Sequence, residues 1–190
     1  SKGYAKGQIQ NPHGLAFDKE GRLLIADRDN GRIQLFDKEG NYLDEWHSEE
    51  LGRPWSLVTD EDGFLYSIDG GDQDADNPRS GIVKLSPDGK AICRFSSFGN
   101  GPGELNWGHS IAVSEDGEEV FAVDLKNARV QKFISNNQNN DNYVVDLVWA
   151  ESSFKPSKPP LGVAYKNGIV YVTLDGEGEP ILLLNTNNGQ

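Results

Sequence analysis

The sequence predicts an all-β fold in which one unit of four short strands is repeated along the chain. No segment of the 190 residues has the apolar spacing of a helix of ten residues or more. The 22 glycines and 9 prolines, together with many Asn and Asp residues, divide the chain into short apolar runs separated by turns. A marker of a proline-like position, a variable residue and a small residue also recurs four times, as "NPHG" (11–14), "RPWS" (53–56), "WGHS" (107–110) and "PPLG" (159–162).

The same register continues inside each copy. An aspartate follows the variable residue of the marker after 14 or 15 positions, at Asp27, Asp69, Asp124 and Asp175. Short strands joined by Asp/Gly/Asn turns form antiparallel meanders. Four such strands in a unit of about 40 to 55 residues are typical of a β-propeller blade, which buries its faces against neighbouring blades. The repeat predicts a single propeller domain over residues 1–190 with four recognisable blades, at approximately 11–50, 53–98, 107–150 and 159–190.

The first two blades each contain four strands. In the first, the strand after "NPHG" is followed by "RLLIAD", "GRIQLF" and "YLDEW", with two "DKEG" turns. In the second, the strand after "RPWS" is followed by "FLYSID", "GIVKL" and "AICRF", with turns at "DEDG" and "SPDG". The insertion "SIDGGDQDADNPRSG" separates its second and third strands. Alternating carboxylates at Asp72, Asp74 and Asp76 are similar to a calcium loop, but the glycine and glutamate that continue an EF-hand are absent, which favours a plain rim loop.

The last two blades follow the same plan. In the third, the strand after "WGHS" is followed by "VFAVD", "ARVQKF" and "YVVDLVW", with turns at "SEDG" and "NNQNN". In the fourth, the strand after "PPLG" and the turn "KNG" lead to "IVYVTLD" and "PILLL", and the copy ends before its outer strand. The chain also begins partway through an inter-blade linker. We expect either a portion of a larger propeller or a small open propeller.

Charge and hydropathy limit the classes of partner. The formal net charge is −12, from 30 acidic against 18 basic residues, so nucleic acid and anionic membranes are not expected partners. The mean hydropathy is −0.60, and no apolar run is long enough to span a bilayer. Cys93 is the single cysteine, so no intrachain disulfide forms. We expect an extracellular or periplasmic location.

The variable residues of the four markers form the first candidate site. The first strand of a propeller blade lines the central channel, so these residues are expected to form a ring at one entrance, made of His13, Trp55, His109 and Leu161. Three histidines scattered by chance over the chain would seldom place two in four ring positions. Imidazoles that converge on a channel are natural zinc ligands, and a catalytic zinc uses three protein ligands and an open position. The alternative is that each ring simply fills a loop entrance. His47 is expected at the surface.

Arg28 is the second candidate. It follows the repeated Asp27, where the other blades carry Gly70, Leu125 and Gly176, so the repeat does not require an arginine there. A fixed guanidinium near a metal suits a carboxylate or another anion. The alternative is a surface ion pair with Asp27 or Asp29. The recurring aspartates are predicted to be turn residues that accept hydrogen bonds from backbone amides.

The inter-blade linkers give the first family resemblance. "GYAKGQIQNPH" (3–13) and "GNGPGELNWGH" (99–109) share glycines ten and six positions before the histidine, followed by Gln/Glu and Ile/Leu. With the P-x-[GS] marker and with "NGRIQ" and "NARVQ", they make the chain similar to the NHL-repeat class of propellers over essentially its whole length.

Within that class, "PHGLAFDKEGRLLIADRDNGRIQLF" resembles the peptidyl-α-hydroxyglycine α-amidating lyase family. The resemblance implies a six-bladed propeller with a central catalytic zinc held by three histidines from P-H-[GSD] motifs. His13 and His109 match two of these ligands, Arg28 matches an arginine that contacts the substrate, and the "GDQ" insertion also agrees. The implied reaction cleaves the C–N bond of a small peptide with a C-terminal hydroxyglycine and gives peptide amide and glyoxylate.

The sequence departs from that family at defined positions. Blades 2 and 4 carry Trp55 and Leu161 at the position of the histidine, so a third P-H motif is absent. We therefore expect the third ligand and the family's catalytic tyrosine upstream of this chain. Ser110 replaces an aspartate that helps the family hold a structural calcium, which places that ion in doubt. Two alternatives stay open: a non-enzymatic NHL scaffold that binds a protein or glycan through Trp55, Trp107 and the rim loop, and, ranked last, a calcium-dependent lactonase-like propeller.

Overall fold

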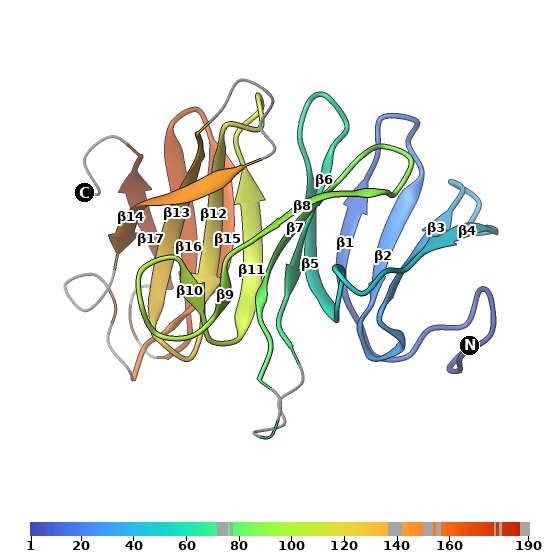
Figure 1. Cartoon of the computed structure of the whole chain (residues 1–190), viewed down its shortest axis with the longest axis horizontal. Coiled ribbons are helices and arrows are strands. Elements are labelled where there is room, and N and C mark those ends of the chain that lie inside the picture. Colours follow the sequence, from blue (N-terminus) through green and yellow to red (C-terminus); the bar gives the residue numbers. More distant parts are fainter. Residues whose placement is uncertain are drawn as a thin grey trace.

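The computed structural model describes residues 1–71, 76, 78–136, 142–149, 154, 157–176, 178 and 180–186. In this part of the chain the fold is all-β, with the N-terminal sheet at one end of the molecule, the next sheet beside it, and the two C-terminal sheets overlapping at the other end of the view (Figure 1). One turn of 3₁₀ helix, Arg28–Asn30, is the only helical element of the described residues. None of the helices described there is long or apolar enough to cross a membrane.

Each sheet is an antiparallel meander with its strands paired in sequence order. Blade 1 consists of β1 (Pro12–Phe17), β2 (Leu23–Asp27), β3 (Arg32–Phe36) and β4 (Tyr42–Trp46). Blade 2 consists of β5 (Pro54–Thr59), β6 (Leu65–Asp69), β7 (Gly81–Leu85) and β8 (Ala91–Phe95). Blade 3 consists of β11 (Gly108–Val113), β12 (Glu119–Asp124), β13 (Arg129–Ser135) and β14 (Tyr143–Trp149). Blade 4 consists of β15 (Pro160–Lys166), β16 (Ile169–Leu174) and β17 (Ile181–Asn185).

These sheets confirm the predicted β-propeller fold with its antiparallel meanders. The Asp-x-x-Gly turns close the hairpins as expected. In the first turn the amide of Gly21 donates to the carbonyl of Asp18 at 3.1 Å, and Gly21 has a φ of +74°, a region that glycine enters without steric cost. The Asp18 carboxylate accepts the amide of Arg22 at 2.8 Å and so pins the start of β2.

The apolar core lies between the blades. Each of three clusters joins one blade to the next: Leu24, Ala26 and Ile33 against Leu57, Leu65 and Val83; Tyr66, Ile68 and Ile82 against Ile111, Val120 and Phe133; Phe121, Val123 and Val130 against Val170, Val172 and Leu184. Each fully buried side chain of this size stabilises the fold by about 1.5–3 kcal/mol. The blades therefore depend on one another for their stability.

The two outermost sheet faces show the same dependence. Leu15 on blade 1 is 63% exposed, whereas Leu57 and Ile111, at the equivalent position of blades 2 and 3, are 6% and 4% exposed. Ile181 and Leu183 on the outer face of blade 4 are likewise half exposed. The apolar stripe of a blade is thus buried only where another blade lies against it.

Buried aspartates connect the linkers to the blades. The Asp27 carboxylate is fully buried and accepts the backbone amide of Gln10 (2.6 Å) and the side chains of Asn30, Arg32 and Gln34 (each 2.8 Å). This explains the "NGRIQ" motif, because its Asn, Arg and Gln all bind one carboxylate. In blade 3 the Asp124 carboxylate makes the same set of bonds with Asn106, Asn127, Arg129 and Gln131.

The prediction that the repeated aspartates are turn residues was therefore incomplete. Asp27, Asp69 and Asp124 do accept backbone amides, but they are fully buried and ion-paired with arginines of the same blade. Asp175, the fourth copy, is exposed, and its carboxylate has no partner among the described residues. Side-chain partners that lie across the sheet decide this difference, and they are not visible in the spacing alone.

The two similar linkers adopt the same structure. Residues 97–105 form two short parallel strands that the sequence did not predict, β9 (Ser97–Phe98) and β10 (Glu104–Leu105), and Lys2 and Ile9 form the equivalent parallel bridge before blade 1. In each linker a glycine amide donates to the glutamine of the adjacent blade, from Gly7 to Gln34 at 2.9 Å and from Gly103 to Gln131 at 2.8 Å. The predicted equivalence of the linkers thus holds at the level of hydrogen bonds.

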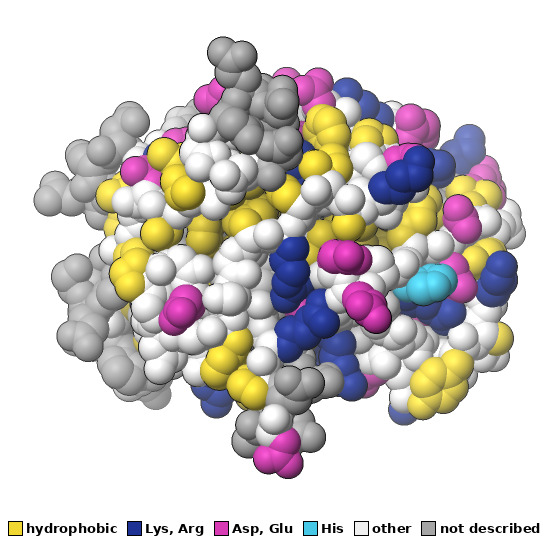
Figure 2. Space-filling model, in the orientation of Figure 1, with side chains coloured by type: hydrophobic (Ala, Val, Ile, Leu, Met, Phe, Trp, Pro, Cys, Tyr) yellow, Lys and Arg dark blue, Asp and Glu magenta, His cyan; other side chains and the backbone are white. Residues whose placement is uncertain are grey.

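On the face seen in Figure 2, acidic and basic side chains are interspersed. The net negative charge is thus not gathered into one patch on this side of the molecule. In the predicted rim loop of blade 2, Asp72 and Asp74 lie outside the described residues, as do most of the "NNQNN" turn and the residues after Thr186.

Candidate functional site

The four ring residues line one pocket. The inner strands β1, β5, β11 and β15 pack against one another in sequence order, so the residue at the same place in each strand faces the same axis. The resulting pocket of about 300 Å³ is lined by His13, Trp55, His109 and Leu161, and by Ser56, Ser110, Gly162 and Thr173 next to them. The ring inferred from the four markers is present.

Hydrogen bonds between blades determine the tautomer of both histidines. His13 Nδ1 lies 2.7 Å from the carbonyl oxygen of Trp55, and His109 Nδ1 lies 2.8 Å from the carbonyl oxygen of Leu161. A carbonyl oxygen only accepts, so each Nδ1 carries the proton and donates it. In the neutral rings the lone pairs are therefore on the two Nε2 atoms. A backbone carbonyl bound to the second nitrogen is also the usual support of a histidine that ligates a metal.

The spacing of the two rings suits one metal ion. The centroids of His13 and His109 are 5.2 Å apart, and their planes are 83° apart. Two imidazoles that bind one tetrahedral zinc at about 2.1 Å have centroids about 5 Å apart. The pair fits two of the three protein positions of a catalytic zinc. The described residues contain no cluster of three or more His, Cys, Asp or Glu side chains that would complete such a set.

Trp55 forms the wall next to the histidines. It is 4% exposed, and its ring lies 4.7 Å from the His13 ring and 5.6 Å from the His109 ring, centroid to centroid. Gly70 makes room for it, because a Cβ at that position would overlap the indole. The indole Nε1 is buried and has no hydrogen-bond partner within the described part of the chain. An unsatisfied donor of this kind is costly unless a ligand accepts from it.

The pKa of His13 is lowered from its ordinary value of 6.5. The largest cause is partial burial, which disfavours the charged ring, and the charges of His109 and Arg28 act in the same direction. The hydrogen bond to the Trp55 carbonyl opposes them. The neutral imidazole, which is the form that binds metal, is thereby favoured at neutral pH.

Arg28 lies over the same tryptophan. Its guanidinium carbon is 4.5 Å from the centroid of a Trp55 ring, and its Nε donates to Asp29 Oδ1 at 3.1 Å. One of the two surface pairs anticipated from the sequence thus forms, whereas the Asp27 carboxylate is occupied by Arg32. Among the described residues, neither terminal nitrogen of Arg28 has a hydrogen-bond partner. The side chain combines a fixed position with two donors that remain available to an anion.

Small residues of the markers allow the inner strands to approach. A Cβ on Gly14 would lie 2.8 Å from the Ser56 Cα and from the Trp55 carbonyl oxygen, the atom to which His13 donates. Ser110 has a similar structural task, because its hydroxyl accepts the backbone amide of Val163 at 3.2 Å and joins blade 3 to blade 4. His47 is exposed, as expected.

Sequence reasoning missed the stacking of Arg28 on Trp55. It also missed a second stacked pair nearby, in which the Lys126 ammonium lies 4.1 Å from a Trp107 ring centroid. The two tryptophan rings are 6.1 Å apart. One signal in the sequence pointed to the stacking: blade 2 has Gly70 at the position that Arg28 occupies in blade 1, and a glycine there leaves space above Trp55.

Comparison with known proteins agrees with this architecture. The family model "NHL repeat" matches residues 10–36. The peptidyl-glycine alpha-amidating monooxygenase B of Xenopus laevis is 32% identical over 133 residues, which cover 67% of this chain and 14% of that protein. The peptidyl-alpha-hydroxyglycine alpha-amidating lyase 1 of Drosophila melanogaster is 29% identical over 136 residues, which cover 65% of this chain and 24% of that protein. A chain of the nidogen/laminin complex superimposes with a TM-score of 0.69 at 16% identity, over 98% of this chain and 64% of that one.

The chain is an NHL-type β-propeller protein. Among proteins of this class it resembles the peptidyl-α-hydroxyglycine α-amidating lyases, and it spans less than a quarter of the length of the curated relatives named above.

Proposed function

We propose that this propeller acts as a zinc-dependent lyase on peptides that end in α-hydroxyglycine. One observation carries the proposal: the ring centroids of two imidazoles, each with Nδ1 bound to a carbonyl oxygen, are separated as two ligands of one tetrahedral zinc are, beside an arginine whose terminal donors are available. The relatives that bear the names of amidating enzymes support it.

The reaction breaks a C–N bond and forms a C=O bond. The α-hydroxyl group loses its proton, its oxygen forms a C=O bond, and the adjacent C–N bond breaks. The amide nitrogen takes up a proton, so the products are a peptide amide and glyoxylate. Zinc held by these imidazoles supplies Lewis-acid chemistry that lowers the pKa of a hydroxyl group.

The residues of this chain supply binding and orientation. The inter-blade hydrogen bonds of His13 and His109 hold both rings in the ligating tautomer. Arg28 binds the carboxylate of the hydroxyglycine through its two terminal nitrogens, because a guanidinium and a carboxylate match in a bidentate pair. Trp55 supports that arginine and excludes water from one side of the site. The base that takes the hydroxyl proton is not assigned to a residue of this chain.

A zinc titration tests the metal site. The metal-free protein is titrated with Zn²⁺ against a chelator of known affinity, and the bound metal is counted by elemental analysis. We expect one zinc per chain and a loss of affinity of at least about tenfold in His13→Ala and in His109→Ala. The exposed histidine provides a matched control, so His47→Ala should bind zinc as the parent does. An absence of bound zinc, or an equal loss of zinc affinity in His47→Ala, would refute the metal site.

A turnover assay tests the reaction itself. Zinc-loaded protein is incubated with an N-acylated α-hydroxyglycine, and the release of glyoxylate is measured. We expect release that His13→Ala abolishes. Zinc binding without glyoxylate release would refute the lyase and favour a scaffold that binds ligands on the same rim.

A further inference from the structure

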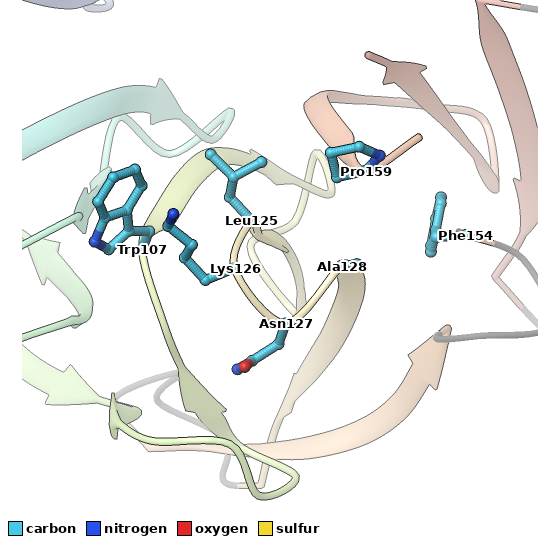
Figure 3. A pocket seen from close by; sticks show the side chains of 7 residues that line it. All are labelled: Trp107, Leu125, Lys126, Asn127, Ala128, Phe154 and Pro159. Carbon is cyan, nitrogen blue, oxygen red and sulfur yellow. The ribbon is translucent and has the colours of Figure 1, made fainter. Parts of the chain in front are cut away.

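A second cavity opens on the same rim, at the junction of blades 3 and 4. It has a volume of about 420 Å³ and lies between the turn after β12 and the segment that enters β15. Figure 3 shows Trp107 and Lys126 together on one side of it, Leu125 and Pro159 along another, and Phe154 opposite the tryptophan. Most of these side chains are apolar, and the buried Phe154 forms part of the wall. The cavity suits an apolar group of substantial size.

Trp107 is held there in an unfavourable backbone conformation. Its φ is +60°, which is a genuine outlier for a bulky residue. Hydrogen bonds maintain it: the amide of Leu125 donates to the carbonyl of Trp107 at 3.2 Å, and the amide of Lys126 donates to the carbonyl of Asn106 at 3.1 Å. The equivalent residue of blade 1 is Asn11, with a φ of +56°. Asparagine tolerates this conformation, so the repeat does not require an indole, and strain of this kind collects at binding sites.

Lys126 adds one charge to a wall that is otherwise uncharged and mostly apolar. Its ammonium stacks on the Trp107 ring at 4.1 Å, and no carboxylate pairs with it in the described part of the chain. The available ammonium favours a carbonyl oxygen or an anion near the mouth of the cavity and disfavours a cationic ligand.

The cavity lies close to the histidine pair along the chain and through a row of aromatic rings. One residue, Gly108, separates Trp107 from His109 in the chain. The Trp107 ring lies 6.1 Å from Trp55, whose ring is 5.6 Å from His109. An extended peptide advances about 3.3–3.6 Å per residue. Trp107 is therefore within reach of a side chain from one of the residues before the last when the last residue of a peptide lies at the imidazoles.

We propose that this cavity binds an apolar side chain of a peptide ligand, from the residue before the C-terminal one, and so selects peptides by that residue. The assignment rests on the proposed function only for the direction of the peptide, with its C-terminus at Arg28 and the histidines. The ligand class is peptides with Phe, Leu or another large apolar residue in this position.

Peptide binding tests the proposal without turnover. Acetyl-Phe-Gly, acetyl-Ser-Gly and acetyl-Lys-Gly are titrated into the metal-free and the zinc-loaded protein, and indole N–H resonances are followed by NMR. We expect acetyl-Phe-Gly to bind at least about tenfold more tightly than the other two, with the Trp107 resonance shifted. Trp107→Ala should abolish that preference and Trp107→Phe should restore part of it.

A second variant distinguishes loss of the cavity from loss of the fold. Leu125→Trp fills the cavity and leaves Trp107 in place, so it should weaken acetyl-Phe-Gly binding without changing the affinity for acetyl-Ser-Gly. Equal affinities of the parent for all three peptides, or a preference that survives both Trp107→Ala and Leu125→Trp, would overturn the inference. A preference for acetyl-Phe-Gly in a protein that binds no zinc would instead refute the metal site and leave the cavity assignment standing.

Discussion

Removal of one buried carboxylate should test how the blades are held together. Asp27→Ala deletes the acceptor of four hydrogen bonds, among them the 2.8 Å ion pair with Arg32, whose side chain is 9% exposed. Breaking a buried pair by deleting one partner costs about 3–5 kcal/mol, because the remaining charge stays buried without its counter-ion. Arg32 keeps Glu45 and two backbone carbonyls, so the lower part of this range is expected.

The matched control lies in the same repeat. Asp175 occupies the same position of blade 4, but it is exposed and has no side-chain partner among the described residues, so Asp175→Ala should change the free energy of unfolding by less than about 0.5 kcal/mol. Urea unfolding gives both values, and a thermal melt gives the equivalent shift of about 2–4 °C for each kcal/mol in a chain of this size. Similar losses in the two variants, or a loss below about 1 kcal/mol in Asp27→Ala, would refute the view that these carboxylates organise the blade.

Three further predictions concern the histidine pocket. In the metal-free protein, NMR titration of His13 should show a pKa below 6.5, and Arg28→Gln should raise it, since the arginine charge disfavours the protonated ring; an unchanged midpoint would contradict that coupling. Because the unfolded chain then binds this proton more tightly than the folded one, the contribution of His13 to stability should fall as pH drops below 6.5, and unfolding at stepped pH measures it. Gly70→Ala should lower the free energy of unfolding by about 1–3 kcal/mol and weaken zinc binding, because the added methyl group displaces Trp55. An unchanged free energy of unfolding and an unchanged zinc affinity would show that the indole has room to move.

Much of the architecture follows from local sequence signals. The Asp/Gly turns and the apolar alternation define each strand from residues a few positions apart, and the repeat predicts that equivalent positions of successive blades face one axis. That is why the markers located the pocket correctly, with His13 and His109 side by side although 96 positions separate them. The roles of both histidines as metal ligands and of Arg28 as a contact for the substrate remain predictions for the experiments above.

The side-chain partners of the repeated aspartates could not be predicted from the sequence in the same way. The aspartates recur at the same spacing in all four copies, yet three are buried acceptors of several side chains and Asp175 is exposed. The difference arises because Asp27 and Asp124 lie opposite an arginine on the next strand, and a glutamine two residues after that arginine also donates to the carboxylate, whereas blade 4 has neither residue there. The spacing in the sequence predicts where each aspartate lies in its blade, whereas its hydrogen-bond partners depend on the register of the neighbouring strand.

The sequence by itself determined the repeat, the all-β propeller fold and the identity of the ring residues, because strands and turns are encoded by neighbouring side chains. The tertiary structure alone decided which ring nitrogen of each histidine carries the proton, which tryptophan supports Arg28, and that Trp107 lines a second cavity. The two proton positions depend on carbonyl groups 42 and 52 residues away, and the support of Arg28 depends on a ring from the next blade. Their positions are set by how closely the inner strands pack, and small residues such as Gly14 and Gly70 control that approach.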